Sequence, residues 1–215
     1  MNIFNVALLT RAFLFFSYPT KMSGNSVWVA DESIFGLGNT LPDTFTCATP
    51  LGEVAAGSLN MSPMEMFVGL IPGSVGETSV IAIAIGAVIL LVSGIASWRT
   101  MGSVFVGGAL TAWLFQALGM TPITWYEHLM LGGFCFGAVF MATDPVTSAR
   151  TIPGQFIFGL LIGIMAVLVR VMNPGYPEGM MLAILFANMF APLIDYCVVQ
   201  RNIKKRMNRL TQNNN

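Results

Sequence analysis

A run of hydroxyl-bearing and small residues, Asp43-Thr44-Phe45-Thr46-Cys47-Ala48-Thr49-Pro50-Leu51, is the first candidate for chemistry in this chain. Taken alone, its turn-forming Asp-Thr pair, small residues and proline also fit a loop that docks on a membrane surface, so both interpretations stay open. A Ser-His-Asp arrangement does not compete. The only histidine, His128, begins an apolar segment, where a capping or packing role is typical.

Two carboxylates, Asp144 and Asp195, lie in or at the ends of apolar segments and close to Pro145 and Pro192. A carboxylate inside a membrane costs about 2.5 to 3.5 kcal/mol on insertion scales, so its presence asks for a function. Proline frees backbone carbonyls that can coordinate a cation in broken transporter helices. The pair predicts either cation binding or, for Asp144 especially, an ordinary helix-ending Asp-Pro turn.

Aromatic and basic residues accompany these acids. Phe136 and Phe140 stand at helical spacing before Asp144, where packing is the simpler interpretation and a hydrophobic gate the sharper one. Arg11 and Arg170 lie at membrane depth, where each can reach the interface, pair with an acid or neutralise a bound anionic group.

The composition places these residues in a membrane protein. Of 215 residues, 55% are hydrophobic and 9% are charged, against about 25% charged in soluble domains. Ten basic and ten acidic residues cancel without forming a basic stripe, which argues against a nucleic-acid partner. The three cysteines are far apart and indicate neither a disulfide framework nor a metal site.

The chain therefore divides into a half-helix or truncated helix (1–19), a long extracytoplasmic loop (20–78), a five-helix transmembrane bundle (79–200) and a basic cytoplasmic tail (201–215). Apolar runs of about 18 residues cross a hydrocarbon core of about 30 Å. The fold class predicted is all-α, with about five transmembrane helices, of which the third and fourth are short or interrupted. They are expected at 79–97, 101–118, 128–143, 156–172 and 179–199.

The distribution of charge predicts the orientation, because Lys and Arg gather in cytoplasmic loops. Five basic residues follow the last span, which places the C-terminus in the cytoplasm and residues 17–78 outside. That outer segment contains one lysine and six acids: Asp31, Glu32, Asp43, Glu53, Glu65 and Glu77. A loop of this length is usually functional.

Several long motifs together carry a family resemblance. They are Arg11-Ala-Phe-Leu-Phe-Phe-Ser-Tyr-Pro19, Ile71-Pro-Gly-Ser-Val-Gly-Glu77, Gly94-Ile-Ala-Ser-Trp-Arg99, Phe140-Met-Ala-Thr-Asp-Pro-Val146, the stretch 173–188, Ala191-Pro-Leu-Ile-Asp195 and Val199-Gln-Arg-Asn-Ile-Lys204. Through them nearly the whole chain resembles the C-terminal half of the NqrB/RnfD family, which comprises NqrB of bacterial sodium-translocating NADH:quinone reductases and its Rnf relatives. The resemblance implies one half of an inverted-repeat, transporter-like fold.

The resemblance also implies a cofactor. The Asp-x-x-Ser/Thr-x-Ala-Thr pattern is similar to the family's flavinylation motif, formed here by Asp43, Thr46, Ala48 and Thr49. FMN would be joined through its phosphate to the Thr49 hydroxyl, which attacks the pyrophosphate of FAD on a flavin transferase. Cys47 stands where the family usually has glycine. Riboflavin is a further cofactor that the family implies.

For function, the resemblance implies an electron carrier within a six-subunit complex in the bacterial inner membrane. Electrons would pass from NADH, bound on another polypeptide of the complex, to ubiquinone while sodium moves outward. Asp144 and Asp195 would take up sodium, and Phe136 and Phe140 would gate its path. Two alternatives remain: an RnfD-type protein coupled to ferredoxin, and a small-solute channel on the same scaffold.

Overall fold

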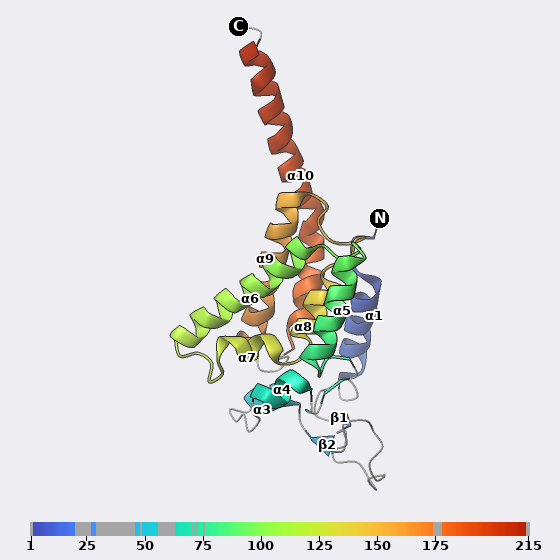
Figure 1. Ribbon diagram of the computed structural model, residues 1–215, viewed down its shortest axis with the longest axis vertical. Coiled ribbons are helices and arrows are strands. Elements are labelled where there is room, and N and C mark those ends of the chain that lie inside the picture. The colour runs from blue at the N-terminus through green and yellow to red at the C-terminus, as the bar shows by residue number, and fades with distance from the viewer. Residues whose placement is uncertain are drawn as a thin grey trace.

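The computed structural model describes residues 2–19, 27–28, 46–47, 49–55, 63–69, 71, 73–74, 76–173 and 178–213. Helices dominate these ranges (Figure 1). A two-residue antiparallel pair, β1 (Val27–Trp28) with β2 (Thr46–Cys47), is an addition to the predicted all-α fold. The helices are α1 (Val6–Ser17), α3 (Pro50–Ala55), α4 (Pro63–Val68), α5 (Val80–Val92), α6 (Trp98–Ala117), α7 (Trp125–Met130), α8 (Phe134–Phe136), the π-helix η1 (Gly137–Met141), α9 (Ile152–Met172) and α10 (Met180–Asn213).

Within these ranges, α9 and α10 are each long and apolar enough to cross a membrane. They correspond to the predicted spans 156–172 and 179–199. The 101–118 span corresponds to the 20-residue α6, and the half-helix expected near the N-terminus is present as α1. The predicted span 79–97 is shorter in the structure. It corresponds to α5, which has 13 residues and is about 20 Å long at 1.5 Å per residue. It ends where Gly94 adopts a positive φ of 71°, a common C-terminal cap.

The core forms where small residues let α6 and α9 approach closely. A Cβ atom added to Gly107 would lie 2.8 Å from the Leu160 carbonyl oxygen, and one on Gly159 would collide with the Ser103 hydroxyl. One on Gly163 would collide with the Val104 carbonyl oxygen. Without a hydrophobic driving force between helices in lipid, such close backbone contact supplies the packing energy.

The predicted 128–143 span is broken in the middle, as its glycines indicate. Leu131 leaves the helical region and Gly132 takes a φ of 60°, so α7 ends and a second short helix, α8 continued by η1, begins after Gly133. In η1 the Ala142 N–H donates to the Gly137 carbonyl, a π-type bond that is frequent at functional sites.

The last helix differs most from expectation. Pro192 predicts a break in the backbone and residues 201–215 a separate tail, yet α10 continues through Pro192 to Asn213. Proline inside a transmembrane helix is tolerated when neighbouring groups satisfy the freed carbonyl. The C-terminal part of α10 projects from the bundle at the end opposite α3, α4, β1 and β2 (Figure 1).

Candidate functional site

Thr49 lies directly before α3, where its hydroxyl oxygen accepts a hydrogen bond from the Gly52 N–H at 3.3 Å. It therefore caps the helix, with Pro50 in the first helical position where proline is favoured. Thr49 as a whole residue is half-buried. Of its motif partners, Thr46 pairs through β2, whereas Asp43 and Ala48 lie outside the described residues.

Leu51 ties α3 to the break in the membrane helix. A Cβ atom built on Gly132 would lie 3.1 Å from Leu51 Cδ2 and 3.7 Å from an Arg170 guanidinium nitrogen. Leu51 is buried in a cluster with Met66, Ile123 and Leu131. The segment that follows Thr49 is thus packed on the point where α7 ends.

Arg170 stabilises that end of α7 from the neighbouring helix α9. Its guanidinium donates hydrogen bonds to the carbonyl oxygens of His128 and Leu131. The side chain is only 6% exposed. The last carbonyls of a helix lack intrahelical partners and carry partial negative charge, so a buried cation compensates both. The sequence placed Arg170 at membrane depth but predicted interface or acid contacts and missed its carbonyl partners.

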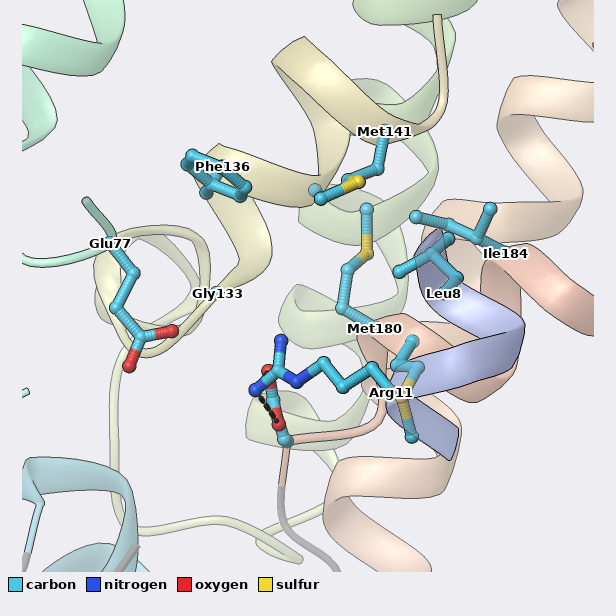
Figure 2. Close-up of a pocket in the computed structure, with 11 residues that line it drawn as sticks. Leu8, Arg11, Glu77, Gly133, Phe136, Met141, Met180 and Ile184 are labelled. Atoms are coloured by element: carbon cyan, nitrogen blue, oxygen red, sulfur yellow. Dashed lines mark hydrogen bonds and ion pairs between the residues drawn. The ribbon is translucent and has the colours of Figure 1, made fainter. Parts of the chain in front are cut away.

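A cavity of about 30 Å³ lies beside the break, between α1, α8, η1 and the start of α10 (Figure 2). At one end Arg11 forms an ion pair with Glu178 at 2.9 Å. Carboxyl oxygens of Glu77 and Glu178 lie 3.2 Å and 3.1 Å from a Cβ built on Gly133, so both acids converge there. Burial raises the pKa of Glu178, and Glu77 adds to the rise, while Arg11 opposes it.

Phe136 and Phe140 are brought together, as their spacing predicts. Their ring centroids are 5.0 Å apart with an interplanar angle of 44°. Phe136 lines the cavity, and the Phe140 ring rests on Gly86 of α5, with Cζ 2.6 Å from a Cβ built there. Both residues are half-buried. The pair therefore extends from the cavity, which Phe136 lines, to α5, which Phe140 contacts.

Asp144 and Asp195 accept hydrogen bonds from opposite ends of the segment 144–151. Asp144 accepts hydrogen bonds from the Val146 N–H at 3.1 Å, the Thr147 hydroxyl at 2.9 Å and the Asn5 amide at 3.4 Å. Asp195, on α10, accepts from the N–H groups of Arg150 and Thr151 at 2.9 and 3.0 Å and from the Thr151 hydroxyl at 2.6 Å. The structure therefore places both acids at one loop, distant along the fold from Thr49, and gives each a turn- or helix-capping role.

Replacing Arg170 with lysine should lower the stability of the protein by about 1.5 to 3 kcal/mol, because an ammonium cannot bridge two carbonyls as a planar guanidinium does. Thermal unfolding of the purified protein in detergent measures the change. Arg201→Lys on the exposed part of α10 is the matched control and should leave the unfolding midpoint unchanged. Equal unfolding midpoints for the two variants would show that the hydrogen bonds from Arg170 to the two carbonyl oxygens do not contribute to stability.

Glu178 is not among the site residues predicted from the sequence, and Glu77 is predicted only as part of the outer loop. A usable signal was the Gly132-Gly133 pair, since a helix break inside a membrane needs nearby polar groups to satisfy its freed backbone. The polar residues near the break are Arg170, from α9, and Glu178, from the segment before α10. No local sequence pattern connects either residue to the two glycines.

Comparisons with known proteins identify the family of the chain. The family described as NQR2, RnfD, RnfE matches residues 1–204. The NqrB subunit of Na(+)-translocating NADH-quinone reductase from Chromohalobacter salexigens is 55% identical over 218 residues, covering 97% of this chain and 50% of that protein. The proteins of the same name from Klebsiella pneumoniae strain 342 and Pseudomonas aeruginosa strain PAO1 are 49% identical, covering 97% of this chain and 52% of theirs. The chain spans about half the length of the curated relatives it matches.

Proposed function

The chain belongs to the NQR2, RnfD, RnfE family, and from that premise we propose that it carries covalent FMN as the C-terminal half of an NqrB subunit in a sodium-translocating NADH:quinone reductase. In this role it passes single electrons toward ubiquinone while sodium is exported. Its relatives with 49 to 55% identity are named as the NqrB component of that reductase, which favours this function over the RnfD type.

The observation that carries the proposal is the position of Thr49. Thr49 is half-buried directly before α3, where we expect a transferase to reach its hydroxyl, and Leu51 packs α3 on the helix break at Gly132. A flavin phosphate esterified to the Thr49 oxygen would be tethered to a fixed element of the fold. These residues fit the group.

FMN, when bound, supplies one-electron transfer at a potential that the protein tunes. The chain's own residues hold and orient it: Thr49 as the point of attachment and α3 as the support. Arg170, by neutralising the end of α7, keeps the surface under Leu51 rigid. Attachment forms the bond from the Thr49 oxygen to the FMN phosphorus, breaks the bond from that phosphorus to AMP in FAD, and releases the hydroxyl proton.

Sodium, the cargo, would enter at Asp144 and Asp195. Carboxylate oxygens are the hard ligands that such a cation prefers, and both acids border one loop. Phe136 and Phe140 would narrow the path where Phe136 meets the cavity, because a hydrophobic constriction gates ions by dewetting. The partners are the other polypeptides of the six-subunit complex, ubiquinone, a flavin transferase and the bacterial inner membrane; riboflavin is the further cofactor.

Denaturing gel electrophoresis under ultraviolet light tests the cofactor proposal. The chain expressed with its transferase should give a fluorescent band, because an ester bond survives denaturation. A small-solute channel on the same scaffold would give a dark band. Dependence of quinone reduction on sodium then separates the sodium pump from a ferredoxin-coupled relative.

Asp144→Asn and Asp195→Asn should each raise the half-saturating sodium concentration for quinone reduction about tenfold, the effect of losing about 1.4 kcal/mol of binding. The asparagine keeps one oxygen ligand and loses the charge. Thr151→Val is the control for the cap, since it deletes a hydrogen bond to Asp195 and keeps the carboxylate. An equal shift in Thr151→Val would mean that the loop's structure, and not the charge, sets the sodium response.

The proposed orientation is supported by the separation of the ends of the molecule: α3 and α4 lie opposite the basic part of α10 (Figure 1). A reporter fused after Asn215 should be active in the cytoplasm, and one inserted at residue 55 should be active outside. Cytoplasmic activity from the fusion at residue 55 would reverse this topology.

A further inference from the structure

Asn188, in the middle of α10, has a side chain whose polar groups are left without partners. It is 1% exposed, and neither its amide nitrogen nor its amide oxygen forms a hydrogen bond within the described part of the chain. Buried polar groups are nearly always paired with protein, water or an ion. An orphaned amide at this depth therefore indicates a bound species.

The backbone at the same residue gives an independent indication. In a regular helix the N–H of residue 192 would donate to the carbonyl of residue 188. That residue is Pro192, which has no N–H, although α10 continues through it. Asn188 thus offers a side-chain oxygen without a partner and a backbone oxygen that lacks its usual donor at residue 192, and carbonyl oxygens of this kind replace the hydration shell of cations in membrane proteins.

Asn188 lies on the same side of α10 as two residues of the cavity wall, although it does not itself line the cavity. Met180 and Ile184 both line that cavity, and Asn188 follows at the next interval of four, on the same face of the helix. Helical side chains lean toward the N-terminus of their helix. Asn188 is thus one turn from Ile184, which Figure 2 shows on the cavity wall with Met180.

This position lies between two polar groups of residues. Glu77, Glu178 and Arg11 line the cavity beyond Met180. In the other direction along α10, Asp195 lies seven residues further on, and the amide of Asn5, at the start of α1, reaches Asp144. Asn188 is the buried polar residue on the helix that connects the two ends.

We infer that Asn188 binds a small, partly hydrated monovalent cation inside the membrane, through its amide oxygen and the carbonyl freed by Pro192. Water retained by the ion accepts from the amide nitrogen, which satisfies both orphaned groups. The cavity of about 30 Å³ that reaches Ile184, one turn before Asn188, has room for water, since about 10 to 15 Å³ suffices for one molecule. The inference rests on the proposed function, in which sodium crosses this protein, and adds a binding residue between the aspartates and the outer acids.

The test compares Asn188→Leu with Asn202→Leu in the assembled complex. Both place leucine on α10, but Asn202 is exposed beyond the bundle. Sodium is titrated at constant ionic strength against potassium, and two quantities are measured: the half-saturating sodium concentration for quinone reduction and the rise in the unfolding midpoint that sodium produces. Asn188→Leu should raise the first about tenfold or more and reduce the second, while Asn202→Leu should match the wild type.

An unchanged sodium response in Asn188→Leu, with a higher unfolding midpoint without sodium, would overturn the inference and make residue 188 a dry packing position. If Asn188→Leu fails to assemble, Asn188→Ser is tested in its place. Its hydroxyl oxygen can still bind the ion, so the half-saturating sodium concentration should rise only about threefold. An unchanged half-saturating concentration in Asn188→Ser would overturn the inference. A potassium response equal to the sodium response would also overturn it. If quinone reduction by the wild-type complex does not depend on sodium, the proposed sodium pump itself is refuted. That result is distinct from any difference between variants.

Discussion

A Thr49→Val variant should carry no flavin that survives denaturation, whereas the wild-type chain should fluoresce on the gel. Valine keeps the shape of threonine and removes the only oxygen that an ester at this position can use. The predicted loss is complete, because attachment is covalent and needs that atom. The band should persist on protein staining, since residue 49 lies outside the helices that span the membrane.

Thr49 also caps α3, so the loss of label must be separated from the loss of the cap. Valine at this position should cost about 1 kcal/mol of local stability. Thr49→Asn keeps a capping oxygen without a hydroxyl and should be equally dark, while Thr49→Ser keeps both and should be labelled. Thr46→Val should retain the band, and Cys47→Gly should label as well as the wild type or better. A fluorescent band from Thr49→Asn would show that the flavin is attached to a residue other than Thr49.

Gly163→Leu should lower the unfolding midpoint of the protein in detergent by about 6 to 12 °C, which corresponds to about 3 kcal/mol in a chain of this size. A side chain at this position meets backbone atoms: the Val104 carbonyl oxygen, and the Gly108 nitrogen at 2.6 Å. Backbone cannot rotate away as a side chain can. The helices α6 and α9 must therefore separate, and the buried cluster that both support loosens.

Gly102→Leu is the matched control on α6, because nothing lies within 4 Å of a Cβ atom built there. Both substitutions gain the same helix propensity, up to about 1 kcal/mol, so their difference isolates the clash. The control should unfold within about 2 °C of the wild type. Equal midpoints for the two variants would mean that α6 and α9 do not pack as closely as the structure describes.

Apolar length and glycine content predicted the helices that local sequence controls. Residues 6–16 form α1, α9 and α10 begin near the predicted positions, and the span with Gly132 and Gly133 is interrupted. These outcomes depend on hydropathy and on the backbone freedom of glycine, both of which are written in neighbouring residues.

What the sequence could not predict depends on partners far along the chain. Arg170 binds carbonyls some forty residues earlier, and Asp195 caps the start of α9 from α10. Pro192 suggested a break, but its cost of about 3 kcal/mol is offset by the packing of α10 on α9 and α1. The predicted roles of Thr49, Asp144 and Asp195 in flavin attachment and sodium binding remain proposals.

The continuity of α10 has a mechanical consequence. At 1.5 Å per residue its 34 residues extend for about 50 Å, some 20 Å more than a hydrocarbon core. The part beyond Pro192 is about 30 Å long and holds the five basic residues Arg201, Lys204, Lys205, Arg206 and Arg209. A tilt of about 10° at Pro192 would move the tip by about 5 Å. Pro192 lies one turn from Asn188, so a small change of helix direction at this point would produce a much larger displacement of the basic end of α10.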